Sequence, residues 1–138
     1  MADRSNWNSA IIEEFRANEG RVGAFASQPL LLLTHTGARS GRQRTNPLAY
    51  LADGDRFVVF ATKGGSPTNP DWFHNLVANP TVTIEVGTES FEVEAEVAEG
   101  DERERLWKEQ VSRNRSFGDY EARTSRKIPV IVLRRTSA

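Results

Sequence analysis

Two pairs of short apolar segments, each joined by a tight turn, constrain the fold of this chain more than any other feature of its sequence. Residues 47–51 and 56–62 flank an Asp-Gly step, and this dipeptide between two apolar runs is a strong signal for a β-hairpin. Residues 81–86 and 91–97 alternate in polarity around a glycine-containing turn, which predicts a second hairpin with one face exposed to solvent. The sequence therefore predicts a fold built on antiparallel strand pairs.

Two further apolar runs extend this set to about six strands. Residues 30–33 are all leucine, which predicts a buried strand, and residues 129–133 are apolar enough to predict a last strand buried on both faces. So many short strands would leave exposed edges unless the sheet closes on itself. We therefore expect an α+β, mainly β fold: a closed or half-closed barrel of antiparallel strands with peripheral helices, forming one domain over residues 1–138.

The first expected helix covers residues 9–20 and follows a polar segment, residues 1–8, that is expected to be disordered. Ile11 and Phe15 lie on one helical face, and Gly20 follows as a stop signal. The helix carries too few Lys and Arg residues for a typical membrane-surface helix, so a lid packed on the barrel is favoured. Peripheral membrane contact through this helix is the alternative.

A second helix is expected to begin at residues 69–71, Asn-Pro-Asp, with the asparagine as the capping residue and Pro70 as the first helical residue. It ends before Pro80. The expected buried stripe of this helix consists of Trp72, Phe73, Leu76 and Val77.

A third helix is expected after Asp101, which forms a capping box with Glu104. Arg103 and Arg105 are expected as charges on its surface. Residues 113–120 are expected to form an aromatic-containing turn or a short helix.

Charge and composition exclude several classes of function. With 18 basic and 19 acidic side chains the formal net charge is −1, which argues against a general nucleic-acid binder. The chain has no cysteine, which excludes disulfides and thiolate chemistry, and no signal peptide is visible, so a cytoplasmic protein is favoured. The longest apolar run is far short of a membrane span. His35 and His74 lack metal-ligand spacing and are expected as packed or exposed neutral imidazoles, so no metal site is expected.

Residues 34–46, which we call the arginine segment, join the strand at 30–33 to the strand at 47–51 as a predicted loop. The segment has two glycines and, within six residues, three permanent cations: Gly37, Gly41, Arg39, Arg42 and Arg44. No acidic residue lies between Glu19 and Asp53, so nothing nearby in sequence neutralises these arginines. On this pattern alone a solvated turn is as consistent as an anion site. Companion motifs favour a site for phosphate or carboxylate groups.

Those companion motifs, in order along the chain, resemble the deazaflavin-dependent nitroreductase family. The motifs are LLLLTHTGARSGRQRTNPL at 30–48, Lys-Gly-Gly at 63–65, NPDWFHNL at 69–76 and Ala-Asn-Pro at 78–80. The resemblance implies a split β-barrel related to that of FMN-binding oxidases. It also implies coenzyme F-420, an 8-hydroxy-5-deazaflavin with a phospholactyl and oligoglutamate tail, whose reduced form donates a hydride. Such a tail is a string of anions, which matches the cations of the arginine segment.

The resemblance also implies residue roles. The implied cofactor-binding residues are Arg39, Ser40, Gly41, Arg44, Thr45, Asn46, Pro47, Ala61, Thr62, Lys63, Gly64, Trp72 and Asn75. The phosphate and the tail carboxylates would be held by Arg39, Ser40 and Arg44. Lys63 would close on the phosphate or the ring. Tyr120 would position the acceptor and donate or relay a proton, with Thr62 as a hydrogen-bond donor near the ring.

The acceptor side departs from the family pattern. Ala49, Phe117 and Arg123 stand where members that reduce quinones or nitroimidazoles tend to have tyrosine or another aromatic residue. We therefore expect an F-420-dependent oxidoreductase that acts on a small electron-poor acceptor such as a quinone, an enone or a nitroaromatic. The alternatives are an FMN-dependent oxidase or reductase on the same barrel, a non-enzymatic F-420 carrier, and an RNA-binding module, which would need an exposed aromatic platform. The protein is expected to be a monomer or a homodimer.

Overall fold

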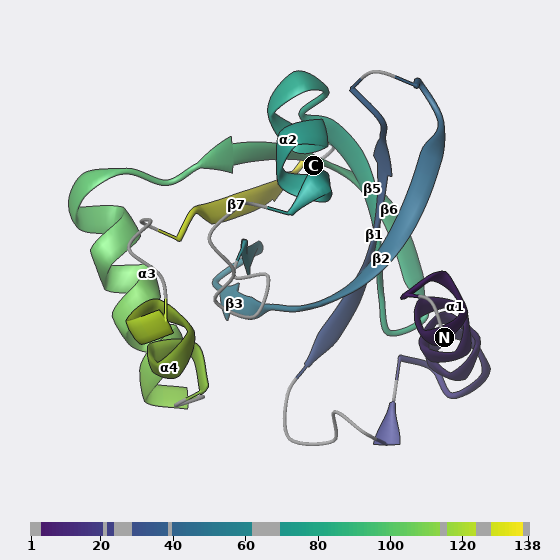
Figure 1. The fold of residues 1–138 in the computed structure, drawn as a ribbon, viewed down its shortest axis with the longest axis horizontal. Coiled ribbons are helices and arrows are strands. Elements are labelled where there is room, and N and C mark those ends of the chain that lie inside the picture. The colour runs from purple at the N-terminus through teal and green to yellow at the C-terminus, as the bar shows by residue number, and fades with distance from the viewer. Residues whose placement is uncertain are drawn as a thin grey trace.

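The computed structural model describes residues 4–20, 22–23, 29–38, 40–61, 70–113, 116–123 and 128–136, with the backbone alone at 4–8, 116, 120, 121 and 123. These residues form four helices and seven strands, drawn in Figure 1. In chain order they are α1 Arg4–Ala17, β1 Leu30–Thr36, β2 Gln43–Ala49, β3 Leu51–Asp53, β4 Arg56–Phe60, α2 Asp71–Ala78, β5 Thr81–Val86, β6 Glu89–Val97, α3 Gly100–Arg113, α4 Ser116–Arg123 and β7 Val130–Arg135.

The strands of the described chain make one antiparallel sheet in the order β2-β1-β5-β6-β7-β4-β3. β2 and β3 follow each other along the chain yet form opposite edges of this order. The sheet must therefore curl until its edges approach, which gives a half-barrel (Figure 1). The predicted fold class is confirmed.

The described chain has seven strands where about six were expected, because the segment predicted as a single strand at 47–51 is divided. β2 ends at Ala49 and β3 begins at Leu51. The Tyr50 N–H donates a 3.1 Å hydrogen bond to the Pro29 carbonyl, which continues the β1–β2 register by one residue. From Leu51 the chain leaves β1 and pairs with β4.

Strand alternation divides the apolar residues between the inside of the half-barrel and its two covered outer surfaces. Leu31 and Leu33 point inward, where they join the largest core cluster, and Leu30 and Leu32 point outward against α1. α3 and α4 cover the outer side of β4 and β7, at the opposite end of the molecule from α1 (Figure 1). Full burial of each large aliphatic side chain contributes about 1.5–3 kcal/mol.

The first helix begins earlier than expected. α1 starts at Arg4 and ends at Ala17, so part of the segment predicted to be disordered is helical. Ile11 and Phe15 are buried against β1, as a lid requires. The alternative of membrane contact stays a prediction without support, since these apolar side chains are already covered. Within the described segments, no helix has the length and apolar character needed to cross a membrane.

Three local predictions for the other helices are wrong. Pro70 is the residue before α2 and not its first helical residue, because its ψ of 156° is extended; Asn69 lies outside the described residues. In the predicted stripe Trp72 and Leu76 are buried, but Phe73 is only half-buried and Val77 is 59% exposed. Arg103 is a buried charge.

Arg103 is buried with partners for its two terminal guanidinium nitrogens and for its flat face, while its Nε has no hydrogen-bond partner among the described residues. Its guanidinium donates to the Ile128 carbonyl at 2.6 Å and to Glu104 at 3.0 Å, and it lies 5.1 Å from the centre of the Trp107 ring. These contacts join α3 to the segment that leads into β7.

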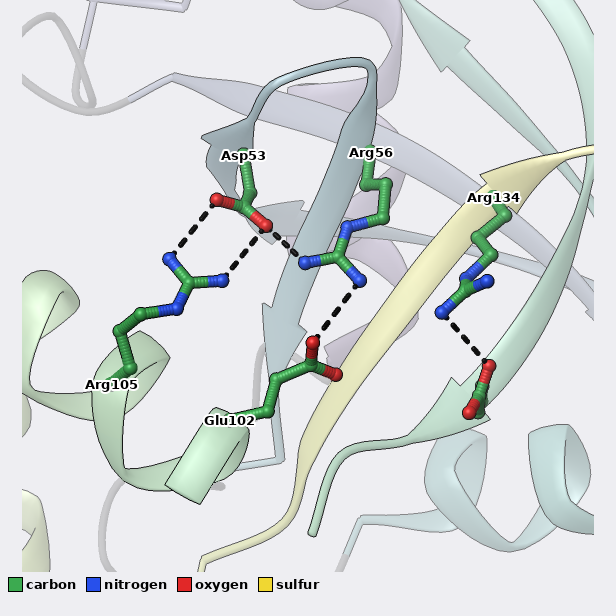
Figure 2. Close-up of polar contacts among 6 residues, drawn as sticks. Asp53, Arg56, Glu102, Arg105 and Arg134 are labelled. Carbon is green, nitrogen blue, oxygen red and sulfur yellow. Dashed lines mark hydrogen bonds and ion pairs between the residues drawn. The ribbon is translucent and has the colours of Figure 1, made fainter. Parts of the chain in front are cut away.

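An ion-pair cluster fixes the β3–β4 hairpin to α3 (Figure 2). Asp53 accepts hydrogen bonds from Arg105 at 3.2 Å and also from Arg56, which reaches Glu102 at 3.4 Å. Hydrogen bonds from Arg105 and then from Arg56 lower the pKa of Asp53 below its usual value. The cluster is partly exposed, so its contribution to stability is modest and screened by salt.

Gly20, the predicted stop signal of the first helix, is required for the packing of α1 on the sheet. Its φ is +93°, and a Cβ there would lie 2.8 Å from Cα of Gly87 in the β5–β6 turn. Gly20→Ala is therefore expected to lower the free energy of unfolding by about 2–4 kcal/mol in urea titrations, from backbone strain plus a backbone clash. Gly54→Ala is the matched control, since Gly54 has a φ of +63° with nothing within 4 Å. It should lose only about 1 kcal/mol, and equal losses would contradict the clash.

Candidate functional site

The arginine segment forms a shorter loop than predicted, because β1 and β2 extend into it. Only residues 37–42, the β1–β2 loop, lie between the paired residues Thr36 and Gln43. The loop is closed by hydrogen bonds from the Gly37 N–H to the Arg42 carbonyl at 2.8 Å and from the Gly41 N–H to the Gly37 carbonyl at 3.0 Å. Gly41 has a φ of +71°, and a Cβ at Gly37 would lie 2.5 Å from the Ser40 hydroxyl. The shape therefore favours glycine at Gly41, and a side chain at Gly37 would require the Ser40 hydroxyl to move.

An open groove of about 620 Å³ lies between the β1–β2 loop and α2. It is lined by Gly37, Ala38, Ser40, Arg44, Asp71, His74 and Asn75. The loop supplies a hydroxyl and backbone groups, β2 supplies a guanidinium, and α2 supplies an amide, an imidazole and a carboxylate. This groove brings together three of the predicted site residues from separate motifs, Ser40, Arg44 and Asn75, as an anion site requires.

Two arginines close together in sequence, Arg42 and Arg44, lack the carboxylate partners that the other arginines with described side chains have. Arg42 and Arg44 make no ion pair with any residue in the described part of the chain. The remaining arginines with described side chains each pair with a carboxylate: Arg16, Arg56, Arg103, Arg105, Arg113, Arg134 and Arg135. Arg44 lines the groove and Arg42 does not. A cation at the groove is therefore free to bind an external anion.

A buried histidine, His35, links the β1–β2 region to α2. Its Nε2 lies 2.6 Å from Oδ1 of Asn46 on β2, and its Nδ1 lies 3.0 Å from Nδ2 of Asn75 on α2. Asn75 in turn accepts a 2.9 Å hydrogen bond from the Ala38 N–H in the loop. Burial lowers the pKa of His35, opposed by the hydrogen bond to Asn46, and the charge of Arg44 lowers it more than the charge of Asp71 raises it.

Comparison with known proteins gives the family. The model of the family described as F420H(2)-dependent quinone reductase matches residues 7–135. The chain belongs to this family. It is 42% identical to the F420H(2)-dependent quinone reductase Rv1261c of Mycobacterium tuberculosis H37Rv over 126 residues, which cover 88% of this chain and 85% of that protein.

Solved structures agree with this family assignment and with the split-barrel fold. A structure of an F420-H2 dependent reductase superposes with a TM-score of 0.70 at 38% identity, over 76% of this chain and 93% of that one. A second, described as a domain-swapped dimer, has a TM-score of 0.72 at 32% identity, over 95% of this chain and 99% of that one. The resemblance seen in the four sequence motifs is confirmed.

In this member of the quinone reductase family, strand alternation separates the predicted cofactor residues of β2. Arg44, the register partner of His35, and Asn46, the register partner of Leu33, lie on the same face as His35. Thr45 and Pro47 lie on the opposite face, where the Thr45 hydroxyl is 2.9 Å from that of Thr34. Only the first pair is on the face that carries the link to α2.

Two further predicted cofactor residues belong to the core of the half-barrel. Trp72 is 7% exposed and Ala61 is fully buried, and both join the inner cluster. The Ala61 N–H donates a 3.0 Å hydrogen bond to the Pro129 carbonyl. Phe117, one of the departures from the family pattern, also packs as core, with its ring centre 5.6 Å from that of Phe60. Any contact of Trp72 or Ala61 with a cofactor would use only a small part of each residue.

Several predicted residues cannot be placed. Arg39, Thr62, Lys63 and Gly64 lie outside the described residues. Tyr120 is on α4, but its side chain is likewise outside the description. Their predicted roles stay predictions.

His35 is the functional candidate that sequence reasoning missed. The signal was present in the period of two along β1, since His35 follows Leu31 and Leu33 on the inward face. What the sequence did not reveal is that Asn75, forty residues away, supplies the partner of its second nitrogen.

Proposed function

We propose that this protein binds coenzyme F-420 with its anionic tail in the groove between the β1–β2 loop and α2, and reduces a quinone-like acceptor. The family assignment makes the chain an oxidoreductase with F-420 as cofactor, and the FMN alternative has no support. The observation that carries the location of the tail is Arg44, an exposed cation that lines the groove without a carboxylate partner among the described residues.

The residues of the groove fit an anionic tail. The Arg44 guanidinium offers several N–H donors in a plane, which suits phosphate and carboxylate oxygens, and the Ser40 hydroxyl lies in the same groove. Asp71 is the one acid among the described lining residues, so the field is not uniformly positive. We expect the tail to run beside Arg44 and Ser40 and away from Asp71.

The roles of the chain in the reaction follow from this placement. Reduced F-420, when bound, supplies the hydride that the acceptor receives. Arg44 and Ser40 hold the tail and thereby orient the ring, and Arg39 and Lys63 are proposed to add cations from the segments outside the description. Tyr120 is proposed to position the acceptor and to donate or relay the proton that a reduced quinone needs, with Thr62 donating a hydrogen bond near the ring.

The function is tested by binding and turnover with purified protein. F-420 should bind at micromolar concentrations, measured by its fluorescence, and reduced F-420 should be oxidised only when a quinone is added. An enone and a nitroaromatic in the same panel define the acceptor class. Oxidation that no acceptor accelerates, together with tight binding, would indicate the carrier alternative. FMN binding in preference to F-420 would overturn the proposal. Light scattering on the same sample would show whether the protein is a monomer or a homodimer.

A further inference from the structure

The hydrogen bonds around His35 have only one consistent direction. The Ala38 N–H can only donate, so Oδ1 of Asn75 must be its acceptor and Nδ2 of Asn75 must point at His35. An amide nitrogen can only donate, which leaves Nδ1 of His35 as an acceptor without a proton. The proton of the neutral ring is therefore on Nε2, where it is donated to Oδ1 of Asn46 at 2.6 Å. One backbone N–H of the loop thus fixes an amide orientation and a histidine tautomer.

Protonation of His35 on Nδ1 breaks this network whichever way the Asn75 amide is turned. A proton on Nδ1 faces the amide hydrogens of Asn75 across 3.0 Å, so two donors oppose each other. If the Asn75 amide turns over to accept that proton, its nitrogen then opposes the Ala38 N–H across 2.9 Å. Either arrangement leaves donors unpaired next to a side chain that is 2% exposed, which is unfavourable.

The charged groups around His35 do not remove this conflict. From β2, Arg44 adds a positive charge that opposes protonation, and from α2, Asp71 adds a negative charge with a smaller effect. His74, also on α2, lines the groove and is exposed. The folded-state pKa of His35 lies below its usual 6.5. The network is therefore intact above about pH 6.5 and is lost as the pH falls through that lower folded-state pKa.

We propose that neutral His35 is a positioning residue that holds the β1–β2 loop against α2, and so makes the affinity for the anionic tail of F-420 depend on pH. The inference rests on the proposed function of the groove. Ala38 and Asn75, which the network joins, both line the groove, so their separation sets its width. The further contact between α2 and β1, from Asn79 to the Thr36 carbonyl, is 3.4 Å long and exposed. The bonds of the His35 network are shorter, and the two made by His35 itself are partly buried, while the bond from Ala38 to Asn75 is exposed.

The network itself is tested first in the cofactor-free wild-type protein. Nitrogen NMR of the two histidines at about pH 8 should show His35 as the neutral tautomer with its proton on Nε2. Hydrogen exchange should show a protected Ala38 amide whose protection falls on acidification. A proton on Nδ1, or an Ala38 amide that exchanges as fast as an open loop amide, would overturn the proposal without any variant.

The consequence for binding is tested with His35→Gln and its control. Glutamine keeps a donor for Asn46 and cannot gain a charge. As the pH falls from about 8 to at least one unit below the folded-state pKa of His35, taken from the NMR titration, the affinity of the wild type for F-420 should fall about tenfold more than that of His35→Gln, since at least one partly buried hydrogen bond is lost. His74→Gln removes the other histidine of the chain, which lines the groove, and the affinity of this variant should still fall on acidification because His35 is retained. Changes in the charge of F-420 with pH affect all three proteins alike. They therefore cancel when the fall in affinity of one protein is divided by that of another.

The outcomes separate the two levels of inference. Wild type and His35→Gln that lose affinity in parallel would overturn the role of His35 and leave the proposed function intact. Tighter binding on acidification, abolished in His35→Gln, would also overturn it, because His35 would then act as a cation. No F-420 binding by the wild type at either pH would instead overturn the proposed function, and the pH-dependent affinity with it.

Discussion

Replacing Trp72 with alanine is expected to lower the free energy of unfolding by about 3–5 kcal/mol. Trp72 is 7% exposed and packs in the inner cluster with Leu76 of α2 and with strand residues such as Ile84. Truncation therefore leaves a large cavity beneath α2. The measurement is urea unfolding followed by circular dichroism, with the loss read from the midpoint at an unchanged slope. Because α2 also forms one wall of the groove, affinity for F-420 should fall as well.

Val77→Ala, on the same helix, is the matched control. Val77 is 59% exposed and lines a separate apolar groove on the other side of α2, so its truncation should change stability by no more than about 0.5 kcal/mol. The comparison also tests the role of Trp72 implied by family resemblance. A Trp72→Ala protein with nearly normal stability but much weaker F-420 binding would mean that the ring serves the cofactor and not the core.

The parts of the fold that sequence could predict are those fixed by local patterns. The Asp-Gly hairpin became β3 and β4, and the alternating segments became β5 and β6. Residues 43–46 were predicted as loop because Gln, Arg and Asn carry no strand signal, and one threonine among them does not define a strand. They form a strand because β1 supplies a ladder for them, and that pairing is a tertiary effect that no local window contains.

The candidate site was predictable to a similar extent and for similar reasons. Arg44 was identified from charge clustering, and Asn75 from the resemblance, without any indication that the two would line one groove. Arg103 was predicted as a surface charge because helix periodicity does not reveal that the Ile128 carbonyl needs a donor. His35 was missed as a site residue because its two partners come from other elements, and such partnerships are set by the closure of the half-barrel.

Arg44→Ala is expected to weaken F-420 binding by about 1.5–3 kcal/mol, which is about 10- to 150-fold in Kd. The guanidinium lines the groove, has no carboxylate partner in the described part of the chain, and would make charge-assisted hydrogen bonds to the tail. Since the side chain is exposed, the substitution should leave the unfolding transition within about 0.5 kcal/mol of the wild type. Fluorescence titration of F-420 at a fixed, low salt concentration measures the effect.

Arg42→Ala separates a specific contact from general electrostatics, because Arg42, on the β1–β2 loop two residues before Arg44, also has no ion-pair partner in the described part of the chain but does not line the groove. Its loss should weaken binding only a few-fold and only at low salt, where distant charges are poorly screened. A second comparison changes the ligand. A deazaflavin without the phospholactyl and glutamate tail should bind the wild type and Arg44→Ala with equal affinity. If Arg44 contacts the tail, the effects of removing the side chain and the tail are not additive. Additive losses, or equal losses for Arg42→Ala and Arg44→Ala, would place the tail outside this groove.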